Sequence, residues 1–508
     1  MTPFISPLDT HNQALLAAVH PSDWTQPVPI GVYDFVVIGA GTAGLVAAAG
    51  AAGLGARVAL VERHLMGGDC LNTGCVPSKA LLRSASAAAD ASSFLSLGIN
   101  LPSGFNVDFP AVMERLRRLR AEIAPHDSAQ RFRQLGIDVF FGQARFIAKD
   151  ALDIDGSKIH FRRAVIATGA RPELPQVPGL VQSQPLTHQT LFNLTECPKH
   201  LVVLGGGPVG CELAQAFRRL GSQVTLIHNK SRLLDREDPD ASALVQASLV
   251  KEGVALQLET SLEKVESIDT SKRLHLRSTK GIQHLTATTL LVATGRVPNV
   301  EHLNLETAGV ELDPKKGIFV DDFLRTTNPH IYASGDVCLP WKFTHAADFA
   351  SRIVIQNALF ALGPIGRRRL SSLNMSWCTY TDPEVAHTGL TLHDAQDRGI
   401  QLDTYTQPFN RVDRALLESS SEGFARIHTR RGTGFILGAT VVGKNAGELI
   451  NEISVAMAGK ISLGTLAAVI HPYPTHSEAL RKLGDQYNRT RLTPRTVSLL
   501  KRLLALRR

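Results

Sequence analysis

One short segment of the chain combines two cysteines with a lysine, residue types that carry redox chemistry. It reads GGDCLNTGCVPSK over residues 67–79 and places Cys70 and Cys75 five positions apart with a glycine between them. This spacing can close a small disulfide loop. A helix is expected over Val76–Ser84, and a thiolate near a helix N-terminus has a lowered pKa and is a better nucleophile. Lys79 lies one turn beyond Cys75, where its charge can lie against an electron-rich cofactor ring.

The cysteine pair alone is open to other interpretations. Cys70 and Cys75 could be core residues, because free cysteine is often buried, or could form half of a metal site. The six cysteines of the chain include no second pair at the spacing of structural zinc, so we expect no resident metal. Six cysteines in 508 residues also make no disulfide scaffold, which favours a reducing, cytoplasmic compartment.

Two glycine-rich turns indicate two dinucleotide sites. Each follows a short apolar run typical of a buried parallel strand, at Tyr33–Ile38 and His200–Leu204, and each precedes an expected helix. Such a turn brings backbone N–H groups and a helix N-terminus against a diphosphate. A single turn of this kind is a weak signal, because glycines also serve tight turns, but two in the same setting are specific. The glycines are Gly39, Gly41, Gly44, Gly205, Gly207 and Gly210.

The residues after the second strand of each unit differ in charge. In the first unit Glu62 ends the strand, where a carboxylate can accept hydrogen bonds from ribose hydroxyls. In the second unit no acid follows Gln223–Ile227, and the next residues include Asn229, Lys230 and Arg232. A carboxylate there would repel a 2′-phosphate, whereas lysine and arginine would bind it, so we expect NADPH as the second nucleotide. Alternatively, the two cations are simply solvated.

Further motifs complete a family pattern. Ala-Thr-Gly at 167–169 and Ala-Thr-Gly-Arg-Val-Pro-Asn at 293–299 each follow an apolar strand, and Gly-Asp follows at 335–336. In this order and spacing, the glycine turns, the acid, the cysteine pair and these segments resemble the FAD-dependent pyridine nucleotide-disulfide oxidoreductases. Dihydrolipoamide dehydrogenase, glutathione reductase and mercuric reductase belong to that family. The resemblance covers about residues 33–485.

The resemblance implies where each cofactor binds. FAD would lie on the first glycine turn with Glu62 on its ribose, and NADPH on the second turn. Cys75 would face the flavin as the charge-transfer thiol, and Cys70 would be the exchanging thiol. Lys79 would sit beside the flavin and pair with Glu212. The other residues that the family pattern assigns to the cofactors are Gly142, Ala144, Thr168, Gly169, Gly295, Arg296 and Asp336.

The chain departs from the family near its end. Disulfide-reducing members carry His-Pro-Thr-x-x-Glu, in which the histidine comes from the partner subunit of a homodimer and protonates a leaving thiolate. Here residues 471–478 read HPYPTHSE, so Tyr473 stands at the histidine position, five residues before Glu478. A phenol with a pKa of about 10 is a poor base at pH 7. His471 lies two residues upstream and could substitute, whereas His476 is expected on a helix surface.

In carrying tyrosine at this position, the chain resembles the mercuric reductases. Hg(II) bound by thiolates takes two electrons without a thiol leaving group to protonate. We therefore expect a homodimer that passes electrons from NADPH through FAD to Cys70 and Cys75, and on to Hg(II) or a similar metal ion. A terminal cysteine pair and an N-terminal CxxC domain, both typical of mercuric reductases, are missing from this sequence. The alternatives are a reductase of a small disulfide or a quinone and, in another class, a redox sensor or membrane-surface binding protein without turnover.

Composition and charge narrow these classes. The chain is 44% hydrophobic and 20% charged, which excludes extensive disorder. We expect neither a transmembrane helix nor a secretory signal, because no long uncharged apolar run and no basic segment before an apolar core are found. Residues 481–508 carry nine basic residues and one acid, which accounts for the whole net charge of +8. A charged tail does not favour nucleic-acid binding by a folded face. Its leucines recur at helical spacing and predict a basic amphipathic helix that packs on the dimer or lies on anionic lipid.

The sequence thus predicts an α/β protein with two Rossmann-like dinucleotide-binding domains and a C-terminal α+β dimerisation domain. In the last domain we expect a helix at Ala446–Ala458 and strands at WCTYT and GFILGATVVG. The expected divisions are an N-terminal arm at 1–32, an FAD-binding domain at 33–190 and 303–370, an NAD(P)-binding domain at 191–302, a dimerisation domain at 371–485 and a basic tail at 486–508.

Overall fold

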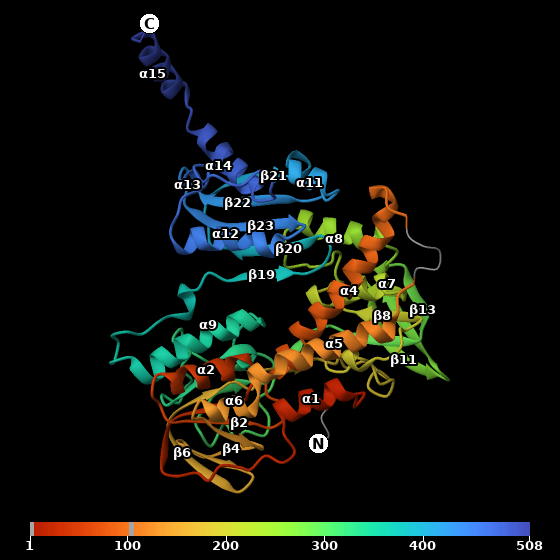
Figure 1. The fold of residues 1–508 in the computed structure, drawn as a ribbon, viewed down its shortest axis with the longest axis vertical. Helices are drawn as coiled ribbons and strands as arrows, with labels where there is room; N and C mark the ends of the chain where they lie inside the picture. The colour runs from red at the N-terminus through yellow and green to blue at the C-terminus, as the bar shows by residue number, and fades with distance from the viewer. Residues whose placement is uncertain (1–4, 101–105, 508) are drawn as a thin grey trace. The chain divides into compact units, whose positions relative to one another are not determined.

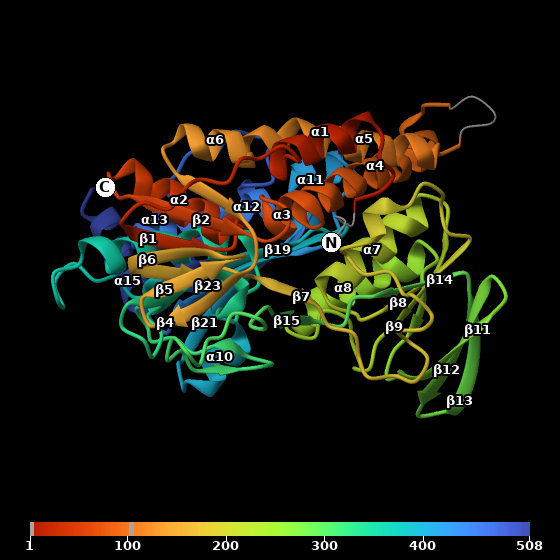
Figure 2. The same cartoon turned by 90° about the horizontal axis from the view of Figure 1, so that it is seen from below.

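The computed structural model describes residues 5–100 and 106–507 (Figure 1, Figure 2). The chain forms two compact units, each of which mixes helices and strands. Residues 1–4 of the expected arm and residue 508 of the expected tail lie outside the described residues, and the expected domain limits stay predictions. The first unit covers Met1–Gly205, Ala216–Ile227 and Thr260–Leu373; the second covers Gly206–Gln215, His228–Glu259 and Asn374–Arg508.

A seven-stranded sheet forms the centre of the first unit. Strand β1 (Val32–Ile38) runs parallel to β2 (Val58–Glu62) on one side and to β6 (Ser157–Ile166) on the other. Most residues of β1 and all residues of β2 are buried, which explains why these strands are continuous apolar runs. The other strands of the sheet are β3 (Asp138–Phe141), β4 (Ala144–Ala148), β5 (Ala151–Ile154) and β18 (Ile331–Ala333).

Helix α2 (Thr42–Gly53) follows the first glycine turn and completes the expected strand–turn–helix–strand unit. It lies along α9 (Thr344–Ile355), as Figure 1 shows. A Cβ atom at Gly50 would come within 2.6 Å of the Ile355 side chain, so the absence of a side chain lets the two helices approach closely. This packing holds α9 against α2 within the first unit.

The second glycine turn follows a similar strand. β8 (His200–Leu204) pairs in parallel with β9 (Gln223–Ile227) and β14 (Thr289–Val292), and the limits of β8 and β9 are those the sequence predicts. Helix α7 (Pro208–Arg219) begins inside the turn. A three-stranded antiparallel sheet shares an apolar core with β8 and β14. Its strands are β11 (Ser261–Ile268), β12 (Ser271–Ser278) and β13 (Gly281–Ala287).

The second unit is built around a five-stranded antiparallel sheet in the order β19-β20-β23-β22-β21. Helices α12 (Ala446–Ala458) and α14 (Glu478–Thr490) pack on this sheet through a shared apolar core. The limits of α12 match the prediction, and both expected strands are present as β19 and β23. The strands are β19 (Ser376–Thr379), β20 (Glu384–Gly389), β21 (Leu402–Pro408), β22 (Phe424–Arg430) and β23 (Ile436–Gly443).

Shorter elements complete the two units. The first unit adds α6 (Ala129–Gln134), the β7–β15 pair (Ala170–Pro172 and Arg296–Pro298) and the β16–β17 pair (Leu312–Asp313 and Gly317–Ile318). The second unit adds α8 (Pro239–Lys251), β10 (Ala255–Gln257), α10 (Leu392–Asp397), α11 (Asp413–Leu417) and α13 (Leu463–Leu466).

The N-terminal arm contains a helix that its weak periodicity did not predict. Helix α1 (Thr10–Val19) begins after Asp9, whose side chain accepts a hydrogen bond from Asn12 N, and it packs on α5 (Phe109–Ile123). Figure 1 and Figure 2 both show α1 beside α5. Beyond α1, the Gln26 side chain exchanges two hydrogen bonds with the backbone of Phe141 at 2.7 and 3.1 Å. The arm therefore covers β3, the edge strand of the large sheet.

The predicted tail helix is present as α15 (Pro494–Ala505), which follows α14. Every residue of α15 is at least partly exposed, and its leucines are 46–60% exposed. Across residues 5–100 and 106–507, no helix combines the length and the apolar character needed to cross a bilayer.

Candidate active site

The two cysteines of the predicted redox pair lie on consecutive helices. Cys70 is on the short helix α3 (Gly68–Asn72), and Cys75 is the first residue of α4 (Cys75–Ser93), a longer helix than the one expected. The Cys75 Sγ atom is 3.2 Å from the Oγ1 atom of Thr344, the first residue of α9. The Cys75 thiol thus lies at the N-terminus of one helix and beside the first residue of another, and both positions favour negative charge.

The proton is shared unequally between the two thiols. The hydrogen bond of Cys70 to Cys75 raises the pKa of the Cys70 thiol, and burial raises it further. Cys70 is half-buried and Cys75 is exposed, which disfavours the interpretation of both as core residues. The Cys70 thiol therefore holds its proton more strongly than an ordinary thiol does.

A charged network that the sequence analysis missed surrounds this pair. Asp69, one residue before Cys70, accepts hydrogen bonds from Thr73 Oγ1 at 2.8 Å, from His188 Nε2 at 3.1 Å and from Arg296. Burial alone would raise the pKa of Asp69, but the His188 hydrogen bond and the charge of Arg296 outweigh it and lower the pKa. Asp69 is therefore a carboxylate that ties the start of α3 to other parts of the unit. The only sequence signal was an acid directly before a cysteine.

Two residues expected to bind cofactors meet in this network. The Arg296 guanidinium is 3.3 Å from Asp336 Oδ2 while it also holds Asp69. Burial alone would lower the pKa of Arg296, but the negative groups Asp69, Asp336 and Cys75 raise it. The guanidinium therefore adds positive charge near the Cys75 side chain.

The first glycine turn is closely packed. A Cβ atom at Gly44 would lie 1.8 Å from the Gly39 carbonyl oxygen, and one at Gly39 would lie 2.5 Å from Ala167 O. The Glu62 carboxylate accepts hydrogen bonds from the backbone N–H groups of Ala40 and His64, each at 2.7 Å. Burial raises the pKa of Glu62, so hydroxyl donors from a ligand would stabilise its charged form.

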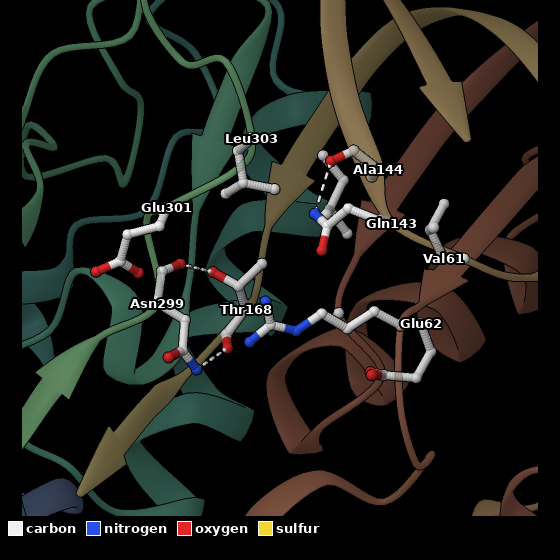
Figure 3. A pocket seen from close by; sticks show the side chains of 12 residues that line it. Val61, Glu62, Gln143, Ala144, Thr168, Asn299, Glu301 and Leu303 are labelled. Atoms are coloured by element: carbon white, nitrogen blue, oxygen red, sulfur yellow. Dashed lines mark hydrogen bonds between the residues drawn. The ribbon is translucent and has the colours of Figure 1, made fainter. Parts of the chain in front are cut away.

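A hollow opens beside this turn (Figure 3). Five residues expected to bind FAD line it together: Gly39, Glu62, Gly142, Ala144 and Thr168. Thr168 and Asn299 hold each other through two hydrogen bonds, from Thr168 Oγ1 to Asn299 O at 2.7 Å and from Asn299 Nδ2 to Thr168 O at 2.9 Å. The sequence analysis did not single out the lining residues Arg63, Gln143, Asn299, Glu301 and Leu303, although Asn299 belongs to the second Ala-Thr-Gly motif.

These residues fit the adenosine part of FAD. The hollow combines a buried carboxylate for ribose hydroxyls with glycines that let the backbone approach a ligand. In the same unit, the Asp336 side chain is 16% exposed, and its carboxylate lies beside Arg296. Gly169 and Gly295 adopt positive φ angles of 69° and 156°, which favour glycine, at the turns after their strands.

The second glycine turn is distributed over both units. In the first unit, a Cβ atom at Gly205 would come within 2.4 Å of Ala293 O. In the second unit, the N–H of Gly206 donates to His228 Nδ1 at 3.2 Å, while Gly207 has open space where a side chain would be. Gly210 is a buried residue of α7. His228 thus binds the turn at the position where Glu62 binds the first one.

The residues expected to bind the phosphate differ in how far their side chains are held by the protein. Asn229 and Lys230 are exposed. The Arg232 guanidinium instead donates to two backbone carbonyl oxygens farther along the same loop, Asp235 O at 2.9 Å and Glu237 O at 3.4 Å. Lys230 is consistent with either phosphate binding or solvation.

Lys79 and Glu212, which the resemblance pairs, belong to different units, so their pairing stays a prediction. Glu212 is 5% exposed, and its Oε1 atom accepts the N–H of Tyr380 at 2.9 Å within the second unit. Lys79 is half-buried on α4.

The 471–478 segment lies in the second unit. Tyr473 is 71% exposed and donates its hydroxyl to Asp413 Oδ2 at 2.8 Å, which raises the pKa of the phenol. His471 contacts Glu452 Oε1 through Nε2 at 2.8 Å and Val469 O through Nδ1 at 3.1 Å. Both ring nitrogens of His471 therefore already face acceptors in the second unit.

The expectation for His476 is wrong. This residue precedes α14 and is 8% exposed, because its ring packs against Phe409 at a centroid distance of 6.1 Å. Burial lowers the pKa of His476. Glu478 is the first residue of α14; its Oε1 atom is 3.3 Å from Arg481 and 3.2 Å from Lys482.

Comparisons with known proteins agree with this arrangement. Residues 33–353 match the model of the pyridine nucleotide-disulphide oxidoreductases, and residues 375–483 match the dimerisation domain of the same family. The mercuric reductase of Streptomyces lividans is 36% identical over 457 residues, which cover 88% of this chain and 95% of the relative. The dihydrolipoyl dehydrogenase of Chlamydia muridarum is 34% identical over 451 residues, with 88% and 95% covered.

A solved structure is also similar. The copper(II) complex of the HOCl-induced flavoprotein disulfide reductase RclA from Escherichia coli has a TM-score of 0.78 at 28% identity, over 90% of this chain and 100% of that one. Fold and site thus define a flavoprotein of the dithiol–disulfide oxidoreductase class. The chain belongs to the pyridine nucleotide-disulphide oxidoreductase family, whose members bind FAD and use NAD(P)H.

Proposed function

We propose that this protein is an NADPH-dependent flavoprotein reductase whose acceptor is Hg(II) or a similar soft metal ion. One turnover would consume NADPH and Hg(II) and give NADP⁺, Hg(0) and a proton. The observation that carries the choice of acceptor is Tyr473, an exposed phenol with a raised pKa where a disulfide reductase has its acid–base histidine. Relatives named mercuric reductase and the copper(II) complex of RclA support a metal acceptor.

Cys70 and Cys75 would carry the redox chemistry. Bound FAD would supply the two-electron relay between the nicotinamide and this pair. The N-terminus of α4, Thr344 and the charge of Arg296 hold Cys75 as the thiolate, while Cys70 keeps its proton until an acceptor arrives. Loss of that proton would make Cys70 the second thiolate of a pair that can ligate a soft cation.

The remaining expected residues would bind and orient the two nucleotides. Glu62, Gly142, Ala144 and Thr168 line a hollow suited to the adenosine of FAD. On the second turn, His228 replaces a carboxylate, so a 2′-phosphate would meet no negative charge from this residue. Lys230 and Arg232 would then attract that phosphate, which favours NADPH over NADH.

The dimerisation-domain match supports a homodimer. In the family pattern Tyr473 would then reach the thiols of the other subunit. There the phenol could donate a hydrogen bond or help to ligate the metal. We further propose a cytoplasmic location, because six cysteines in 508 residues make no disulfide scaffold, which fits a reducing compartment. The basic helix α15 would either pack on the dimer or contact an anionic membrane surface.

Anaerobic assay of one preparation against several acceptors tests the proposal. NADPH oxidation should be measurable with Hg(II) and low with glutathione disulfide, lipoamide and quinones, and it should be lost in Cys75→Ser. Brisk disulfide or quinone reduction without a response to Hg(II) would select the alternative acceptor. Failure to oxidise NADPH with every acceptor would instead favour a redox sensor without turnover.

A further inference from the structure

Helix α5, which packs on α3 and α4, contains a completely buried arginine. We call residues 67–75, which carry both cysteines, the dithiol loop. Arg120 of α5 is 0% exposed, and its Nη1 atom donates to the carbonyl oxygen of Asn72 at 2.6 Å. Asn72 lies between Cys70 and Cys75 and is the last residue of α3. A guanidinium placed out of water is costly unless its N–H groups find acceptors, so its presence at this carbonyl requires an explanation.

The second acceptor of Arg120 comes from the N-terminal arm. Its Nη2 atom donates to Asn12 Oδ1 at 2.6 Å, and Asn12 is also 0% exposed. The Asn12 amide is itself held, because its Nδ2 group donates to Pro7 O at 2.7 Å. The oxygen of Asn12 is therefore aimed at Arg120 and cannot be exchanged for the nitrogen without loss of both hydrogen bonds.

A second connection joins the arm to the same loop. The N–H of Met66 donates to Val19 O, at the end of α1, at 3.1 Å. Met66 precedes two glycines with positive φ, Gly67 at 86° and Gly68 at 57°, and Gly68 is the first residue of α3. Glycine, a flexible residue type, thus borders the five-residue helix α3. The arm holds one end of α3 directly, through Val19, and the other end through Asn12 and Arg120.

We propose that Arg120, held by Asn12, is a positioning residue for the dithiol loop, so that the N-terminal arm is part of the redox centre. Through the Asn72 carbonyl it sets the place of Cys70 relative to Cys75, and with it the hydrogen bond that leaves the charge on Cys75. The inference rests on the proposed redox role of this cysteine pair.

A neighbouring ion pair provides a matched control. Arg117 lies one turn before Arg120 on α5, is 7% exposed and pairs with Asp9 at 2.5 Å. Asp9 is the residue that caps α1, so this pair also docks the arm. Among the described residues, the Arg117 side chain forms its hydrogen bond and ion pair with Asp9 and none with the dithiol loop. Loss of Arg117 removes docking strength alone, whereas loss of Arg120 removes docking strength and loop position.

The test compares the FAD-loaded variants Arg120→Met and Arg117→Met with wild type. The reduced enzyme is alkylated with iodoacetamide between pH 4 and 10, and the long-wavelength charge-transfer absorbance is recorded after titration with dithionite. For Arg120→Met we expect the midpoint of the thiolate titration to rise by at least half a pH unit, which is equivalent to about threefold slower alkylation at neutral pH. The charge-transfer band should also be weaker. Arg117→Met should lower the melting temperature by about as much as Arg120→Met does, while its pH profile and its charge-transfer band stay at wild-type values.

Equal shifts in both arginine variants, or a wild-type profile in Arg120→Met, would overturn the proposal. Should Arg120→Met fail to fold, Asn12→Ser leaves Arg120 on Asn72 but removes its second anchor, and it must show the same shift in smaller degree. Arg120→Lys should restore part of the band. Failure of the proposed function is separate: it would appear as wild-type enzyme with no band and no NADPH turnover, while the alkylation profiles still report on the loop.

Discussion

The two units hold their expected site residues in different ways. In the first unit, Cys70, Asp69 and Glu62 each have several partners within the protein before any ligand binds. In the second unit, Lys230 and Tyr473 are exposed side chains. We infer that the first unit is a preorganised redox site, whereas the second offers residues that await a nucleotide or a second subunit. Substitutions should therefore abolish function in the first unit and adjust specificity in the second.

The two glycine turns show this difference on one motif. Glu62 and His228 each accept the N–H of the second residue of their turn, Ala40 at 2.7 Å and Gly206 at 3.2 Å. A side chain holds the turn in both cases, but only Glu62 carries a negative charge in its ordinary state. Burial lowers the pKa of His228. The same local geometry can thus serve two dinucleotides, of which only the proposed NADPH carries a 2′-phosphate on its adenosine.

The largest effect should come from the first turn. Gly44→Ala would place a Cβ atom 1.8 Å from the Gly39 carbonyl, so the turn must open and FAD should be lost. Gly53→Ala on the same helix meets nothing within 4 Å and should bind FAD as wild type does. In the second turn, the open Gly207 should accept alanine with normal FAD content and a raised KM for NADPH. Flavin absorbance per subunit measures the FAD content of all three variants, and initial rates at varied NADPH concentration measure the KM. A Gly44→Ala protein with full FAD content would contradict this assignment.

The next effect concerns the cysteine pair. Cys75→Ser should abolish the charge-transfer band and lower turnover by at least about a hundredfold, because the stabilised thiolate is lost while FAD stays bound. Cys70→Ser should keep a band and lose turnover. Anaerobic reductive titration followed by absorbance measures both variants. If the band survives in Cys75→Ser and disappears in Cys70→Ser, the roles of the two thiols are reversed.

How far the sequence could predict this site follows from the range of the interactions. The glycine turns, β8, β9 and the cysteine pair depend on neighbours in the chain, so their patterns were readable. Helix α1 was missed because its buried face includes Asn12, a polar residue satisfied by Arg120, 108 positions away. His188 on Asp69 and the burial of His476 likewise depend on distant residues. No pattern in the neighbouring sequence indicates such partners.

Nucleotide choice should change by a smaller factor. We expect kcat/KM for NADPH to exceed that for NADH by at least about tenfold, the scale of one charge-assisted phosphate contact. His228→Glu combined with Lys230→Ser should reduce or reverse this ratio, because it adds a carboxylate and removes a cation. Lys280→Ser, at an exposed turn elsewhere, is the control. Equal use of both nucleotides by the wild type would refute the assignment of NADPH.

The acceptor prediction tests the exposed phenol of the second unit. Tyr473→Phe should lower the Hg(II) rate about tenfold or more, the scale of a lost positioned hydrogen bond, whereas Tyr487→Phe on α14 should not. Tyr473→His should raise disulfide reduction if it has any effect. Initial rates of NADPH oxidation with Hg(II) and with lipoamide measure these changes. If the wild type reduces disulfides and ignores Hg(II), His471 becomes the residue to substitute next.

The smallest effect should come from the tail, where no described side chain is buried. Near an anionic surface each lysine or arginine contributes about 1 kcal/mol, and this attraction falls as salt is added. If α15 lies on lipid, the full-length protein should sediment with phosphatidylserine vesicles at low salt, and a 1–490 truncation should not. Lys501→Glu with Arg502→Glu should behave as the truncation does, because the helix keeps its leucines and loses its charge. Equal sedimentation of full-length and truncated protein would leave packing on the dimer as the role of α15, and the truncation should then lower the melting temperature instead.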